Sequence, residues 1–201
     1  MTQHELIFGK WESKAKITDP GIRRYLNLDA RIVLHNQGRH AKKTFGKTKV
    51  HIVERLINSL MRGGTGRKIG GKVIRGRGGT GKKTKMHEIT KKAFEIIHTK
   101  TKQNPVEVLV KAIENAAPRE ETTRVKYGGA IQHLPVDIAP QRRIDFALRN
   151  IARAVAIKSF DTKKTAEEAL AEELILASKN EPSSNAIAKK IEVERIAKSS
   201  R

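Results

Sequence analysis

Apolar side chains recur at helical spacing along most of the chain beyond residue 50. The pattern predicts a helix at about 50–62 and another at about 86–100. A third helix is predicted to begin at Pro105, directly after the capping residue Asn104. Because proline cannot continue a helix, this one is expected to end before Pro118.

Three further helices are predicted in the C-terminal part. The first begins near Pro140, and the second follows the capping box Thr165–Glu168. The last is capped by Ser183 or Ser184 and ends at about Lys198.

The helical rhythm breaks at 121–138, where two β-rich runs flank Gly128–Gly129. Glycine adopts the positive φ of a two-residue hairpin turn, so a β-hairpin is predicted, with Pro135 marking an edge or a bulge. Strands and helices do not alternate, which disfavours a parallel sheet. The predicted fold is mainly α: a bundle of about six helices with a protruding two-stranded β-hairpin and a basic N-terminal arm.

Residues 1–48 show weak periodicity and are predicted to be a basic N-terminal extension, mostly an extended arm. A short turn or helix is predicted within it at Asp19–Leu26. Residues 49–201 are predicted to form a helical domain that carries a glycine-rich basic insertion at 62–85 and the hairpin at 121–138.

The insertion contains GRGGTGKKT (Gly76–Thr84), which matches two phosphate-binding patterns, G-x-x-x-x-G-K and G-x-G-x-x-G. A nucleotide site also needs a buried strand before the glycines and a hydroxyl directly after the lysine. Here Lys83 follows Lys82, and Val73–Ile74 is too short for a central strand. The 24 residues of the insertion hold nine glycines, nine lysines or arginines and no acid. A flexible loop that contacts RNA phosphates is therefore favoured over a nucleotidase.

Charge supports a polyanionic partner, because 42 lysines and arginines face 21 acids, a formal charge of +21. Nucleic acid is favoured over an anionic membrane surface. The absence of cysteine excludes disulfides, Cys-ligated zinc and thiol catalysis. No metal-ligand spacing, nucleophile elbow, signal peptide or membrane span is recognisable. We expect an intracellular protein without enzymatic activity, cofactor or metal.

The basic surface is concentrated in the N-terminal half, where Ala30–His87 contains 16 lysines and arginines and one acid, Glu54. Three elements can face one RNA: the arm Gly38–Lys49, in which Phe45 is a candidate base-stacking residue, the insertion, and the hairpin with the helix after it. RNA is favoured over DNA because no helix-turn-helix, zipper or zinc finger is present. The predicted RNA-contacting residues are Arg39, Lys42, Lys43, Lys47, Lys49, Arg67, Lys68, Arg75, Arg77, Lys82, Lys83, Lys85, Arg119, Arg124, Arg142 and Arg143.

The segments Ile52–Met61, Lys91–Ala152 and Thr165–Ser178 resemble the universal small-subunit ribosomal protein seven family, in its archaeal and eukaryotic-type version. The resemblance covers about residues 17–201. Its most specific element is the hairpin with the residues that flank it, PREETTRVKYGG and PVDIAPQRR. The glycine-rich insertion resembles the archaeal branch.

The resemblance implies a structural component of the small ribosomal subunit in the cytoplasm. It implies binding to the 3′ major (head) domain of small-subunit rRNA, nucleation of head assembly, and a position near the mRNA exit. Transient contact with mRNA and exit-site tRNA is implied, with Lys126, Tyr127, Gly128 and Gly129 nearest the tRNA. Neighbouring ribosomal proteins, including number eleven, are implied as partners. The alternatives are a free regulatory RNA-binding protein, such as one that represses its own mRNA, and a P-loop nucleotidase.

Overall fold

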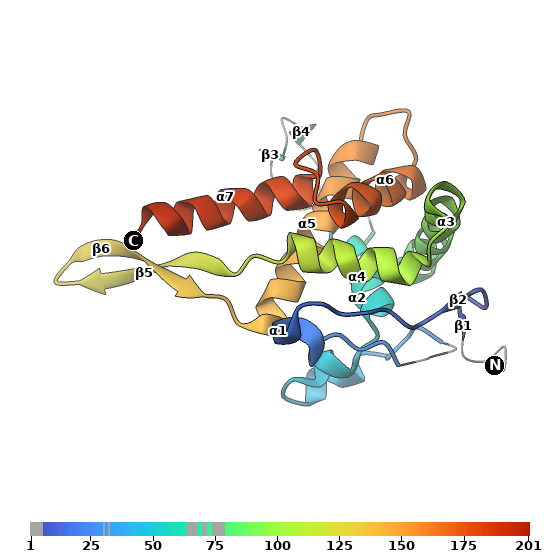
Figure 1. Ribbon diagram of the computed structural model, residues 1–201, viewed down its shortest axis with the longest axis horizontal. Coiled ribbons are helices and arrows are strands. Elements are labelled where there is room, and N and C mark those ends of the chain that lie inside the picture. Colours follow the sequence, from blue (N-terminus) through green and yellow to red (C-terminus); the bar gives the residue numbers. More distant parts are fainter. Residues whose placement is uncertain (1–5, 30, 32, 64–67, 70–71, 74–78) are drawn as a thin grey trace.

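The computed structural model describes residues 6–29, 31, 33–63, 68–69, 72–73 and 79–201 (Figure 1). Within them lie seven α-helices: α1 (Pro20–Arg23), α2 (Ile52–Leu60), α3 (Lys83–Thr101), α4 (Pro105–Ala116), α5 (Pro140–Ser159), α6 (Ala166–Ser178) and α7 (Asn185–Ser199). Two 3-10 turns, η2 (Arg39–Lys42) and η3 (Gly46–Lys49), precede α2. The strands form three antiparallel pairs: β1 (Leu6–Ile7) with β2 (Trp11–Glu12), β3 (Lys68–Ile69) with β4 (Lys72–Val73), and β5 (Glu120–Tyr127) with β6 (Ala130–Asp137). The predicted mainly helical fold with a protruding hairpin is confirmed.

Helix α6 is central to the core, because it packs against α3, α4 and α5. Its inward side chains, among them Ala169, Leu170, Leu174 and Ala177, are fully buried. The alanines let neighbouring helices approach closely, while the leucines supply most of the buried apolar area.

Local capping sets the starts of the helices, as the sequence predicts. The Asn104 side chain accepts a hydrogen bond from the Val106 amide at 3.0 Å. Thr165 and Glu168 form a reciprocal capping box at the start of α6. Ser184, rather than Ser183, caps α7. Each cap satisfies amide groups that the first helical turn leaves unpaired.

Helix α3 begins at Lys83, so the last residues of the predicted glycine-rich insertion are helical rather than part of a loop. The amide of Lys82 donates to the carbonyl of Gly79, and that of Met86 donates to the carbonyl of Lys82. The turn therefore leads directly into the helix. Of the predicted insertion, residues 64–67, 70–71 and 74–78 lie outside the described residues.

The N-terminal segment contributes to the core, which its weak periodicity did not predict. Ile7, Trp11 and Ile22 are buried there. Trp11 meets Phe94 of α3 edge to face, with ring centroids 5.8 Å apart. The helix predicted within Asp19–Leu26 is present as α1, with Asp19 as its cap. Much of the expected arm is thus fixed to the body, because isolated apolar side chains in two short strands and one short helix reach the core.

The β5–β6 hairpin extends beyond the helices, with α7 beside it (Figure 1). Its register is continuous from Glu120 opposite Asp137 to Tyr127 opposite Ala130, so Pro135 sits on an edge strand without a bulge. Gly128 and Gly129 form the turn with φ of +53° and +90°, as a type I′ turn requires.

Helix α7 is fixed at both ends. Near its C-terminus, the carboxylate of Glu194 accepts from the Arg119 amide at 3.0 Å at the base of the hairpin. At its N-terminus, the buried Glu173 of α6 accepts from the Ser184 hydroxyl at 2.7 Å and from the Ala186 amide at 3.0 Å. Lys158 of α5 pairs with the other oxygen of Glu173 at 2.8 Å. One buried carboxylate therefore joins three helices.

Candidate nucleic-acid interface

The predicted RNA-contacting residues divide into two groups by their surroundings. Some are paired with carboxylates inside the fold, and others point into solvent. We call Lys47, Lys83 and Arg143 the inner cations, and add Arg55, which was not predicted to contact RNA but shares a carboxylate with Lys47. The outer cations are Arg39, Lys42, Lys43, Lys49, Lys82, Lys85, Arg119 and Arg124.

Arg55 and Lys47 share one carboxylate on α5. The Arg55 guanidinium lies 2.9 Å from Oδ1 of Asp145 and donates to the Tyr25 carbonyl at 2.9 Å. The Lys47 ammonium lies 2.6 Å from Oδ2 of Asp145. Burial lowers the pKa of Arg55, and the hydrogen bond to Asp145 opposes that effect. These contacts attach η3 and α2 to α5.

Arg143 is also a largely buried cation. Its Nε donates to the Pro118 carbonyl at 3.1 Å, and its guanidinium lies 2.7 Å from Oδ2 of Asp19. Burial raises the pKa of Asp19, but the hydrogen bonds from Arg143 and from the Gly21 amide outweigh it, so the pKa lies below its ordinary value. A cation in the first turn of α5 opposes the helix dipole and suggested an external partner. Here Asp19 is an intramolecular partner of Arg143, and contact of Arg143 with RNA stays a prediction. Its neighbour Arg142 is exposed and pairs with Glu121 at 2.8 Å.

Lys83 pairs with Glu54, the one acid between residues 30 and 87. The carboxylate of Glu54 is buried and accepts from the Lys83 ammonium at 2.7 Å and from the Asn36 amide at 2.7 Å. This contact joins the first residue of α3 to α2 and to the N-terminal segment. Lys82, one residue earlier, is exposed.

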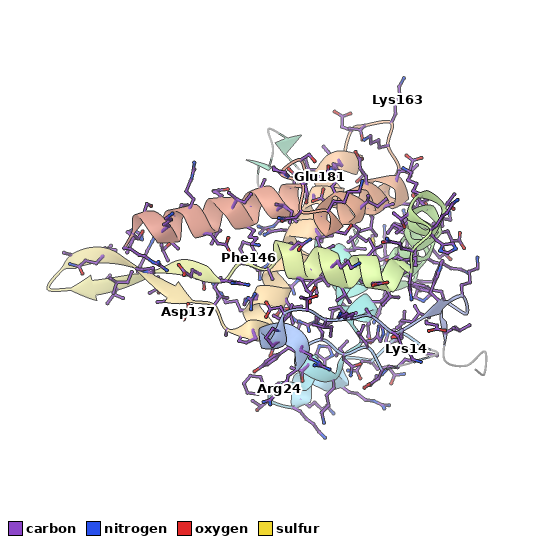
Figure 2. The ribbon with its side chains drawn as sticks, in the orientation of Figure 1. Lys14, Arg24, Asp137, Phe146, Lys163 and Glu181 are labelled. Carbon is purple, nitrogen blue, oxygen red and sulfur yellow. The ribbon has the colours of Figure 1, made fainter. Side chains whose placement is uncertain are left out.

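The outer cations lie on the arm, at the start of α3 and along the hairpin, and all eight are exposed. Within the described ranges, no ion pair joins any of them to a carboxylate. Exposed, unpaired cations suit a phosphate backbone, because they lose no internal partner when they bind it. Lys14 and Arg24, which are labelled in Figure 2, are two further exposed cations of the N-terminal segment.

The hairpin has two different faces. Cross-strand pairing places Arg124 opposite His133 and Lys126 opposite Ile131, which makes one face basic. The alternate positions include Leu134 and Val136, which are 39% and 38% exposed. This second face is mixed, because Val136 lies opposite Glu121 and Leu134 lies opposite Thr123.

Some predicted residues are not assessed by the structure. Arg67, Arg75 and Arg77 lie outside the described residues, and Lys68 is described only as part of β3. The backbones of Tyr127, Gly128 and Gly129 form the hairpin tip.

Comparison with known proteins settles the family. Residues 22–201 match the model of the family described as ribosomal protein S7p/S5e. The chain belongs to the S7p/S5e family. The small ribosomal subunit protein uS7 of Methanothermobacter thermautotrophicus (strain Delta H) is 49% identical over 195 residues, which cover 96% of this chain and 98% of the relative. An archaeal relative agrees with the archaeal and eukaryotic-type resemblance of the sequence. The chain is therefore a structural ribosomal protein of the small subunit and not an enzyme.

One contact in this S7p/S5e chain resembles a catalytic serine–histidine pair. The Ser13 hydroxyl donates to the Leu28 carbonyl at 2.6 Å and lies 2.8 Å from Nε2 of His51. His51 Nδ1 accepts from the Val53 amide at 3.2 Å, so in the neutral ring Nε2 carries the hydrogen. A nucleophilic serine needs an imidazole nitrogen that accepts its proton. The pair is therefore structural, and burial lowers the pKa of His51 to about 4.

Two searches of the described part of the S7p/S5e chain were negative. Its histidines and carboxylates nowhere gather in a group of three that could hold a metal ion. None of its helices is long and apolar enough to cross a membrane.

Sequence reasoning missed Asp19 and Asp145, the carboxylates that neutralise the inner cations. Each is isolated in the sequence and lies about a hundred residues from the cations it binds, so no local pattern identifies it. Glu54 did carry a signal, as the single acid of a long basic segment.

Proposed function

We propose that this ribosomal protein binds the 3′ major (head) domain of small-subunit rRNA and nucleates assembly of the head, in the cytoplasmic ribosome. The observation that carries the proposal is the set of eight exposed outer cations on the arm, on α3 and on the hairpin. These elements come from distant parts of the chain, so together they can follow a folded RNA across several backbone segments.

We further propose that the hairpin tip lies near the mRNA exit and exit-site tRNA. A ribbon that projects beyond the helices reaches past the surface on which the body is bound (Figure 1). The basic face around Arg124 and Lys126 suits RNA, and the face with Leu134 and Val136 suits a neighbouring ribosomal protein. Number eleven, which the sequence resemblance implied, is the expected neighbour.

Filter binding at one salt concentration tests the proposal. The full chain is titrated against the isolated 3′ major domain, against its own mRNA and against an unrelated structured RNA of equal length. Clear selection of the 3′ major domain is expected. Equal affinity for both RNAs would contradict the proposal and favour a free RNA-binding protein. Preference for its own mRNA over both would favour a regulatory one.

Salt dependence tests the role of the outer cations. Eight phosphate contacts correspond to a slope of log affinity against log salt of about −6 to −7. A triple variant, Lys42→Ala, Lys43→Ala and Lys49→Ala, should make this slope shallower by about 2 to 3. The matched control replaces Lys100, Lys102 and Lys163, which are likewise exposed and lie at the end of α3 and in the loop after α5, and it should leave the slope unchanged. If both variants behave alike, only net charge matters and the assigned surface is wrong.

A further inference from the structure

Phe45 combines an unusual backbone with an unusual position. Its φ is +54°, in the left-handed region, which costs free energy in a residue with a bulky side chain. Its side chain is 65% exposed, so the ring contributes little to the hydrophobic core. Neither local preference nor packing accounts for a phenylalanine here. Strained residues of this kind persist where the surrounding structure fixes them and where they serve a function.

The surroundings do fix Phe45, from both sides. The Phe45 carbonyl accepts from the Thr48 amide at 3.0 Å and from the Thr48 hydroxyl at 2.7 Å. Gly46 packs so closely on the preceding turn that a Cβ atom there would clash with the His40 carbonyl oxygen. Lys47 then attaches η3 to Asp145 of α5. The ring is therefore presented on a rigid support and not on a free arm.

The charges around Phe45 indicate what the ring meets. The outer cations Arg39, Lys42, Lys43 and Lys49 lie within six residues of it along the chain. The nearest acid in the segment, Glu54, is buried and already occupied by Lys83. An aromatic ring among unpaired cations suits a nucleotide, whose base stacks on the ring while its phosphates meet the cations.

We propose that Phe45 is a preorganised stacking platform for an unpaired base of the rRNA that this protein binds. The inference rests on the proposed function for the identity of the RNA, whereas the stacking itself does not depend on which RNA is bound. The left-handed backbone turns the ring outward, and the two 3-10 turns hold it there before binding. Less conformational freedom is therefore lost when the base arrives.

The deciding variant is Phe45→Asn, because asparagine tolerates a left-handed backbone far better than phenylalanine does. It should leave the midpoint of thermal unfolding unchanged or raise it by a few degrees. It should also weaken binding to the 3′ major domain by about 5- to 150-fold, the range measured for one lost base stack. The salt slope should stay as in the unaltered protein, since no cation is removed. A fall in the unfolding midpoint together with unchanged affinity would assign Phe45 to the fold and overturn the inference.

Companion variants separate stacking from simple apolar contact. Phe45→Tyr should retain the affinity for RNA. Phe45→Leu, which keeps an apolar side chain without a ring, should lose as much affinity as Phe45→Asn. In Phe45→Trp, RNA should quench indole fluorescence beyond any change from the buried Trp11 of the unaltered protein. Retained binding in Phe45→Leu, or no quenching in Phe45→Trp, would contradict stacking.

A single-stranded RNA oligonucleotide and a duplex of equal length distinguish the two proposals. Phe45→Asn should weaken binding of the single strand and leave binding of the duplex unchanged, because only unpaired bases can stack. If the unaltered protein does not select the 3′ major domain, the proposed function fails, but this comparison still decides the role of Phe45. If the protein selects that domain and Phe45→Asn binds every RNA normally, the proposed function stands and the platform is wrong.

Discussion

The inner and outer cations are the same residue types in neighbouring parts of the chain, yet they have opposite surroundings. Arg142 is exposed, whereas Arg143 is largely buried against Asp19 and the Pro118 carbonyl. Lys82 is exposed, whereas Lys83 neutralises a buried carboxylate. A basic composition therefore does not make every basic residue a ligand for RNA. In this protein a share of the positive charge holds the arm, α2, α3 and α5 together.

The largest expected effect compares the two adjacent arginines of α5. Arg143→Met should lower the free energy of unfolding by about 3 to 5 kcal/mol, because two groups lose their donor at once, the Asp19 carboxylate and the buried Pro118 carbonyl. Each unsatisfied group costs about 1 to 3 kcal/mol, and a charged one costs more. Arg142→Met should change it by no more than about 0.5 kcal/mol, as is usual for an exposed side chain. Urea unfolding measures both. Equal stability of the two variants would mean that the buried contacts of Arg143 do not stabilise the fold.

The next effect concerns His51, an inner residue that has to stay uncharged. Because burial lowers its pKa from 6.5 to about 4, the unfolded chain binds a proton more readily between these values. Stability is therefore fully present above pH 6.5 and falls as the pH is lowered to about 4, by about 3 kcal/mol in total.

Denaturant unfolding at several pH values in this window measures the loss. His51→Asn, which keeps a side-chain acceptor for the Val53 amide, should remove most of it. The exposed His133 on the hairpin supplies the control, and His133→Asn should show the pH profile of the unaltered protein. A profile of His51→Asn that matches the unaltered protein would assign the loss to other groups.

The smallest effects separate the two lysines at the start of α3. Lys83→Ala should lower the free energy of unfolding by about 1 to 3 kcal/mol, since the buried Glu54 carboxylate loses its cation. Lys82→Ala should leave stability unchanged and make the salt slope of RNA binding shallower by about 1. Loss of RNA binding in Lys83→Ala under conditions in which the variant is folded would instead make Lys83 a direct contact.

The parts of the fold that sequence predicts are those set by local interactions. Asn104 and Thr165 cap helices through atoms a few residues away, and Gly128–Gly129 closes a hairpin between adjacent strands. Such signals are readable because the interacting groups lie close together in the sequence.

The parts that sequence did not predict depend on distant residues. Ile7 and Trp11 reach the core from the two-residue strands β1 and β2, which are too short to show a periodic pattern, so the segment around them resembled an extended arm. The contacts of the candidate interface are even harder to predict from sequence, because Arg143 and Asp19 are 124 residues apart. The basic segments could be identified from composition, whereas the division between structural and exposed cations required the tertiary contacts.

Helix α7 has a mechanical consequence through its two fixed ends. A strand of eight residues, as in β5, is about 26 Å long at about 3.3 Å per residue. The hairpin therefore acts as a lever, and a tilt of about 5° at its base would move its tip by about 2 Å. Glu194 attaches α7 to the base of the hairpin, and Glu173 holds the opposite end of α7. The direction in which the hairpin tip points therefore depends on Glu173. A small change buried among helices could thus be amplified into a displacement at the glycines of the turn.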